Sequence, residues 1–254
     1  MFGKLLKYEF KNVNKWYLAL YAATLGLSII LGFWLDGTIN GSLQNATPDV
    51  RVYDSIPLFL TVLIFGIIIA ALFISTFFLI VLRFKNNVYG REGYLTLTLP
   101  VTEHQIILSK LLSALIWTFL STVTFIISVG IIALILASNN HANISEILRD
   151  VEIQKILTNL LPYTFSKFIE TISEILLVYL AISFGQLFEN YRTAIAIAFY
   201  LLVSILPSAL FVLITTPYID EKIFLYTTMS YNIITALLFY FGTYYILKNK
   251  VNLQ

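Results

Sequence analysis

The chain has 254 residues, of which 59% are hydrophobic and only 12% are charged, and its formal net charge is +2. A soluble domain carries about 25% charged residues and about 45–50% apolar ones, so this composition excludes an ordinary soluble globular protein. The apolar residues fall in long runs, and a helix needs about 20 of them to cross a bilayer. The chain contains no cysteine, which excludes disulfides, thiolate metal sites and cysteine nucleophiles. We therefore predict an all-α membrane protein.

Residues 1–15 predict an amphipathic helix that lies in the membrane interface. Apolar residues recur there at helical spacing, and four lysines occupy the opposite face: Lys4, Lys7, Lys11 and Lys15. Such a helix buries its apolar face among lipid chains and turns its lysines toward anionic headgroups. The alternative is that the lysines are the positive flank of a signal anchor.

Six segments are long and apolar enough to predict transmembrane helices: 16–35, 56–82, 106–136, 168–188, 193–214 and 229–247. We expect one transmembrane domain that covers residues 1–254. The stretches 36–55 and 215–228 are predicted to be loops, and 189–192 a short turn. The mixed segment 138–167 predicts one or two amphipathic helices on the membrane surface, which end at Pro162.

The distribution of charge predicts an orientation. Six spans place both termini on the same side of the membrane. With the N-terminus in the cytoplasm, 11 of the 16 basic residues fall in inner segments, and 10 of the 14 acidic residues fall in outer segments. Lysine and arginine are enriched in cytoplasmic loops of membrane proteins, which selects this orientation.

The polar stretch 83–110 separates two very hydrophobic segments and would face the cytoplasm. Residues 89–97 predict a short helix, and Thr102 with Gln105 three residues later fits a capping box that starts the third span. Apolar side chains in this loop, framed by Arg91 and Glu92, indicate a protein contact. The alternative is that they dip back into the membrane interface.

The run REGYLTLTLPVTEHQIILSKLLSALIW, residues 91–117, resembles the first cytoplasmic loop and third helix of ABC-exporter permeases from Gram-positive bacteria. These six-helix permeases work with a separate ATPase and typically begin with an amphipathic interfacial helix. The resemblance implies a bacterial cell membrane location and a peptide or other amphipathic cargo. One departure is that the amphipathic outer segment lies between spans three and four here, whereas family members often carry theirs between spans five and six. This leaves the subfamily and its substrate open, and the chain resembles best the exporters of amphipathic peptides such as phenol-soluble modulins or lantibiotics.

The resemblance also implies partners and a coupling site. A coupling helix in this loop would fit a cleft on the ATPase, and it would be formed by Tyr89, Arg91, Glu92, Gly93, Tyr94, Leu95 and Leu97. Two ATPase subunits and a second permease chain, identical or homologous, are expected to complete the assembly. ATP and magnesium would belong to the ATPase, and this chain would hold no cofactor or metal and bind no nucleic acid.

The chain shows no motif of an enzyme. GxxxxGK[ST], HExxH and GxSxG are all absent from it, so it has no phosphate-binding loop, zincin helix or nucleophile elbow of its own. The two histidines, His104 and His141, fall on opposite sides of the membrane in this topology, and each is predicted to be a solvated loop residue.

Glu170 and Glu174 are the candidate functional acids within the membrane. They lie four residues apart, so they share one helix face. Acidic residues in membrane segments are costly and often functional, and this pair could attract a cationic substrate or bind a proton. The alternative is that both lie at the outer headgroup level with Lys167 as their partner. Serine and threonine recur along 106–136, where they would either allow close helix packing or line a substrate path.

Three functions remain open on these observations. The first is a permease subunit of an ATP-driven exporter. The second is an ion-coupled secondary transporter that uses the two glutamates. The third is a structural membrane subunit without a transport path.

Overall fold

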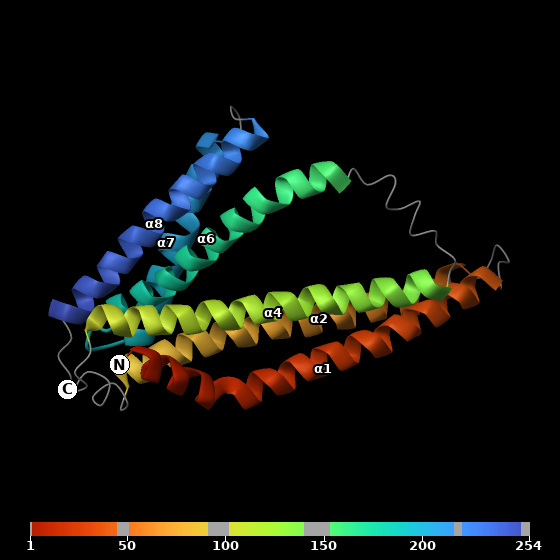
Figure 1. Cartoon of the computed structure of the whole chain (residues 1–254), viewed down its shortest axis with the longest axis horizontal. Coiled ribbons are helices and arrows are strands. Elements are labelled where there is room, and N and C mark those ends of the chain that lie inside the picture. Colours follow the sequence, from red (N-terminus) through yellow and green to blue (C-terminus); the bar gives the residue numbers. More distant parts are fainter. Residues whose placement is uncertain (1, 45–50, 91–101, 140–152, 216–219, 250–254) are drawn as a thin grey trace. The chain divides into compact units, whose positions relative to one another are not determined.

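The computed structural model describes residues 2–44, 51–90, 102–139, 153–215 and 220–249. Its elements are six α-helices and one π-helical turn (Figure 1): α1 (Phe2–Gln44), α2 (Arg51–Phe84), η1 (Lys85–Tyr89), α4 (Glu103–Asn139), α6 (Ile153–Gly185), α7 (Arg192–Thr215) and α8 (Glu221–Asn249). A helix satisfies its own backbone hydrogen bonds, which is what a segment surrounded by lipid requires. The prediction of an all-α fold is confirmed for the described residues.

Among the described residues, six helical segments are long and apolar enough to cross a membrane, and the second of them continues from α2 through η1: Tyr17–Gly37, Val62–Tyr89, Glu103–Ser138, Leu160–Gly185, Arg192–Leu213 and Lys222–Asn249. These segments overlap the six predicted spans one by one. The chain is therefore a multi-pass membrane protein by length and composition of its helices.

Several helix ends differ from the prediction. α1 runs without a break through residues 1–15 of the predicted interfacial helix, from Phe2 onward, and continues past the first span to Gln44. The stretch 36–55 was predicted to be a loop because it is rich in glycine and asparagine, and this was wrong on both sides of the undescribed residues 45–50. Extending a helix that already exists costs little per residue, so the strong apolar span carries weak helix formers with it.

The prediction that Pro162 ends a helix was also wrong. α6 continues through Pro162, and its apolar segment begins at Leu160. α7 likewise contains Pro207. Proline removes one backbone hydrogen bond, but helices in membranes tolerate this because neighbouring groups satisfy the carbonyl that is released. α8 begins at Glu221, so part of the predicted loop 215–228 is helical.

The described helices divide into two compact units. The N-terminal unit consists of Phe10–Phe77 and Ile116–Ile156, and the C-terminal unit of Met1–Glu9, Phe78–Leu115 and Leu157–Gln254. The helices α1, α2, α4 and α6 each contribute a part to both units. Each unit has its own internal contacts.

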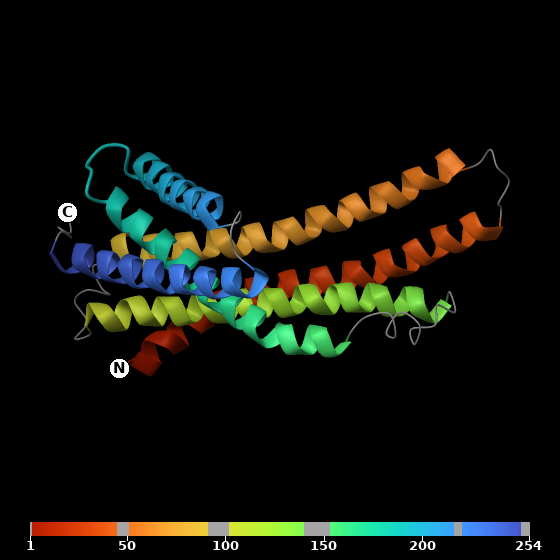
Figure 2. The ribbon, with the colours of Figure 1, turned by 90° about the horizontal axis from the view of Figure 1, so that it is seen from above.

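In the N-terminal unit, α2 runs antiparallel to α1 and α4 (Figures 1 and 2). The ring of Tyr17 on α1 stacks on Trp117 of α4, with centroids 4.2 Å apart. The hydroxyl of Ser121 lies 3.0 Å from the hydroxyls of both Tyr21 on α1 and Thr76 on α2. Hydroxyl residues of the third span thus serve close packing at this point.

The core of the C-terminal unit lies where α6 meets the end of α2 and the start of α4. Phe84 is fully buried and stacks on Tyr179, with centroids 4.0 Å apart. Ile107 of α4 is also fully buried in this cluster. α6 is the central helix of the unit: 61% of its apolar segment is buried, against 0% for that of α7.

Two local features define the ends of helices in this unit. The backbone N–H of Gln105 donates to the hydroxyl of Thr102 at 3.4 Å, so the predicted N-cap of α4 is confirmed. The predicted short turn between α6 and α7 is also present, and its Tyr191 has a φ of 59°. Gly185 permits close approach of the two helices, because a β-carbon there would lie 2.5 Å from the carbonyl oxygen of Arg192.

Candidate binding pocket

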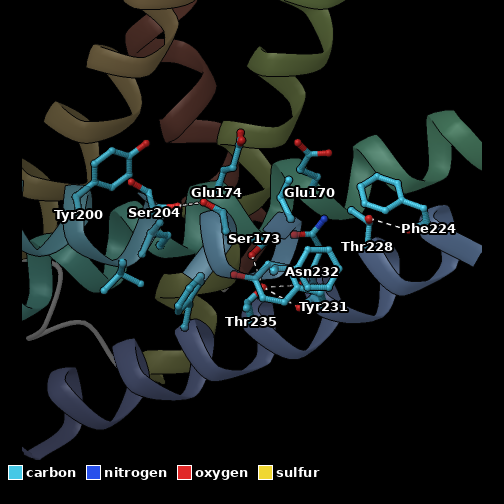
Figure 3. A pocket seen from close by; sticks show the side chains of 16 residues that line it. Glu170, Ser173, Glu174, Tyr200, Ser204, Phe224, Thr228, Tyr231, Asn232 and Thr235 are labelled. Carbon is cyan, nitrogen blue, oxygen red and sulfur yellow. Dashed lines mark hydrogen bonds between the residues drawn. The ribbon is translucent and has the colours of Figure 1, made fainter. Parts of the chain in front are cut away.

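A pocket of about 330 Å³ lies among α6, α7 and α8, within the C-terminal unit. Figure 3 shows its lining, which combines carboxylates, hydroxyls and aromatic rings. α6 contributes Glu170, Ser173, Glu174 and Leu177. Residues one turn apart on a helix share a face, which is why this set points the same way. The two glutamates predicted as candidate site residues therefore line a single cavity.

The two carboxylates have different surroundings. The ammonium of Lys167 lies 2.8 and 2.9 Å from the two carboxylate oxygens of Glu170. Glu174 makes no hydrogen bond or ion pair with any described residue. Of the alternative in which Lys167 partners both acids, the structure shows the ion pair with Glu170 and, within the described ranges, none with Glu174. Figure 3 shows both carboxylates extending in the same direction from α6.

The hydroxyl groups of the pocket are largely engaged within the protein. Ser173 and Thr235 join α6 to α8 through a hydroxyl contact of 2.9 Å. Thr228 donates to the carbonyl of Phe224 at 2.8 Å. The hydroxyls of Ser204 and Ser208 donate to carbonyls of their own helix, α7. A hydroxyl that donates to its own backbone still has lone pairs that can accept.

Asn232 on α8 is the buried polar group that these interactions leave out. It is 8% exposed, and its side-chain amide makes no hydrogen bond in the described part of the chain. Figure 3 shows this amide pointing from α8 toward α6. An amide at the wall of a cavity, with no partner in the described chain, can donate hydrogen bonds to a ligand and accept them from it.

Aromatic side chains form the apolar part of the lining. The rings of Phe211 on α7 and Tyr231 on α8 stack with centroids 4.5 Å apart. Tyr200, Phe224 and Phe239 line the same cavity. The pocket thus offers acidic and hydrogen-bonding groups together with ring surfaces that suit an apolar ligand.

Most residues of the predicted coupling site lie outside the described residues: Arg91, Glu92, Gly93, Tyr94, Leu95 and Leu97. Tyr89 is described, and it ends η1 rather than beginning an α-helix. Its hydroxyl donates to that of Ser183 on α6 at 2.7 Å. Ser183 lies nine positions after Glu174, which is about 14 Å along a helix axis at 1.5 Å per residue. Tyr89 therefore contacts the helix that carries the glutamates, at a distance from them.

The prediction that His104 is a solvated loop residue was wrong. His104 lies in the first turn of α4, and its Nδ1 is 2.7 Å from the hydroxyl of Tyr240 on α8. Its ring also stacks on Tyr244, with centroids 4.0 Å apart. The N-cap at Thr102 begins the helix early enough to include His104. His141 lies outside the described residues.

The sequence analysis did not identify Asn232, Tyr231 or Thr235. A signal was present, because α8 has a mean hydropathy of 1.3, the lowest of the six spanning segments, against 2.9 for α2. Polar residues are energetically costly inside a membrane span, so those that a span contains are candidates for a binding site.

No family model, curated protein or solved structure matches the chain.

Proposed function

We propose that the chain is the permease subunit of an ATP-driven exporter of the bacterial cell membrane. It moves an amphipathic or hydrophobic substrate, such as a peptide, by means of a separate ATPase. The observation that carries the transport function is the pocket among α6, α7 and α8, which places two glutamates inside spanning segments. Ionisable residues in such segments are expensive and mark substrate pathways.

The ATP-driven part of the proposal rests on the resemblance of residues 91–117 to exporter permeases. The ATPases would close on ATP and push the coupling residues 89–97. Tyr89 is hydrogen-bonded to Ser183 on α6, so a displacement of this loop would act on the helix that carries Glu170 and Glu174. This connection offers a physical route from the ATPase to the pocket.

The proposed assembly contains two permease chains and two ATPase subunits, with both termini of the permease in the cytoplasm. The excess of basic residues in the inner segments supports this orientation. α7 exposes most of its apolar surface within the described chain. Such a surface is suited to contact with lipid or with a second permease.

The proposal is tested by affinity purification of the chain from native membranes in mild detergent. We expect a stoichiometric ATPase to co-purify, and we expect the double substitution Tyr94→Asp, Leu95→Asp to release it. Ile144→Asp with Ile147→Asp, in the predicted outer segment, serves as the matched control and should leave the complex intact. Recovery of the wild-type chain alone would remove the exporter assignment.

A second candidate is an ion-coupled secondary transporter. It is favoured by Glu174, which lacks a hydrogen-bond or ion-pair partner among the described residues and lies one turn from Glu170. In that case transport would need no ATPase, and Glu170→Gln with Glu174→Gln would abolish its pH dependence. Transport by the purified chain alone in proteoliposomes, driven by a pH gradient, would favour this candidate over the exporter.

A further inference from the structure

We propose that the pocket binds a primary ammonium group carried on a single apolar chain. The ammonium lies against the carboxylate of Glu174, beside the Lys167–Glu170 pair, in the pocket that Asn232 also lines. The apolar chain lies along the aromatic lining. This inference deepens the proposed function and rests on it for the biological role of the ligand, since it names the class of molecule that the permease would accept.

The charge of the pocket selects a monovalent cation. Its lining contains two carboxylates and no basic residue. Lys167, just outside the lining, neutralises one of them through its contacts with Glu170. One formal negative charge remains, on Glu174. An anionic ligand would be repelled, and a dication would leave one of its charges without a partner in a largely apolar site.

The hydrogen-bonding groups select a donor. Ser204, Ser208 and Thr228 donate their hydroxyl protons to backbone carbonyls, so what they present to a ligand is acceptor lone pairs. The carboxylate of Glu174 is also an acceptor when ionised. The amide of Asn232 on α8 offers both donors and an acceptor, so it can also accept from such a ligand. An ammonium group has three donors and no acceptor, which matches this set.

The aromatic lining and the volume of the pocket favour a ligand whose apolar part is small. Phe211, Tyr231 and Phe224 supply ring surfaces, and aromatic faces also attract a nearby cation. The volume of about 330 Å³ lies at the lower end of the range of about 300–1,000 Å³ for small-molecule sites. An α-helix with its side chains is about 10–12 Å across, so a folded helical peptide does not fit. A peptide cargo would insert one lysine side chain or its amino terminus.

The ammonium could belong to a soluble amine or to the headgroup of an aminolipid. Both carry the same group on an apolar body, so the pocket chemistry is common to them. The lipid composition of the membrane used in the binding experiment separates these two sources.

The test measures binding of radiolabelled dodecylamine to the purified full chain in phosphatidylcholine nanodiscs, after subtraction of binding to empty nanodiscs. We expect a single saturable site. Unlabelled dodecylamine should displace the label, and dodecyl sulfate should not. Glu174→Gln and Asn232→Leu should each weaken binding about tenfold or more, because a charge-assisted or buried hydrogen bond is lost.

Two further variants make the measurement specific. Glu174→Asp keeps the charge and should retain most of the affinity, which excludes a general folding defect at this position. Glu189→Gln removes an exposed acid in the turn after α6 and should bind like the wild type. The absence of a saturable site in the wild type would overturn the inference, and so would a Glu174→Gln variant with wild-type affinity.

Replacement of part of the phosphatidylcholine by phosphatidylethanolamine distinguishes the two sources. Competition by this lipid would identify an aminolipid headgroup as the ligand, and unchanged dodecylamine binding would identify a soluble amine. The experiment contains no ATPase, so its outcome is independent of the exporter assignment. Lost binding with an intact ATPase complex would refute the ligand class alone, whereas binding without any ATPase partner would refute the exporter alone.

Discussion

The two units of this protein differ in where some of their polar side chains lie, although the N-terminal unit also buries one hydroxyl without a partner in the described chain, that of Ser128. In the N-terminal unit, the hydroxyls of Tyr21, Ser121 and Thr76 form one continuous chain of hydrogen bonds across three helices. In the C-terminal unit, Glu174 and Asn232 face a cavity and find no hydrogen-bond partner in the described structure. Closed polar networks stabilise and orient packed helices. Polar groups that face a cavity without a partner lower the stability of the empty protein. A ligand that forms hydrogen bonds with them offsets this cost.

The helices around the pocket differ in how deeply they are buried. In the C-terminal unit, α6 packs on α2 through the stacked rings of Tyr179 and Phe84, and residues of α4 join the same cluster. The apolar segment of α7, in contrast, contains no buried residue. The pocket forms between the tightly packed helix and the loosely packed one. Binding sites commonly lie where packing is incomplete but preformed. The pocket that we propose binds the ligand lies on this open side of α6.

The largest effect should come from Glu174→Leu, which fills the pocket's acidic position with an apolar side chain of similar size. Binding of dodecylamine should be lost, while the thermal unfolding midpoint in detergent should stay constant or rise, because a carboxylate without a partner is removed. A midpoint that falls together with binding would show that Glu174 stabilises the fold, and it would break the contrast between the units.

Gly185→Val should cause the next largest effect. Its side chain would collide with the carbonyl of Arg192 and with Ala196 on α7, and overpacking of this kind costs about 1–3 kcal/mol. The expected result is a lower unfolding midpoint and a distorted pocket with weaker dodecylamine binding. Gly130→Val is the control, because a β-carbon at Gly130 has open space around it, and it should behave like the wild type.

Ser121→Ala should produce a smaller loss of stability without loss of binding. It removes the hydroxyl that joins Tyr21 to Thr76, and hydrogen bonds between membrane helices contribute about 0.6–2 kcal/mol. Thr122→Ala is the matched control, since the Thr122 hydroxyl is exposed and donates only to its own helix, at the carbonyl of Thr118. Equal midpoints for the two variants would contradict a stabilising role for the network.

His104→Phe should have the smallest effect. Phenylalanine can keep the stacking on Tyr244 but loses the hydrogen bond to Tyr240, whose net contribution is about 0.5–1.5 kcal/mol. His104→Ala loses both contacts and should lower the unfolding midpoint further. If the two variants unfold at the same temperature, the stacking contributes nothing measurable.

Some features of the site could be anticipated from short stretches of sequence. Glu170 and Glu174 share a face because helices repeat every 3.6 residues, and Lys167 lies within one turn of Glu170 for the same reason. Thr102 could be recognised as a cap from its spacing to Gln105. Asn232 could not be linked to the glutamates, because it lies 58 residues beyond Glu174 on another helix. Its place in the pocket depends on how α8 packs against α6.

The sequence by itself determined that six apolar helices would form, because hydropathy and helical periodicity are local properties that need no knowledge of neighbours. It did not determine where those helices end, since the strong apolar spans extend α1 to Gln44 and carry α6 through Pro162. Only the tertiary structure decided that His104 packs on α8, that Ser121 closes a network, and that Asn232 joins Glu174 in one cavity. The physical reason is that a contact between helices depends on which faces meet, and packing sets this over distances that no local pattern spans.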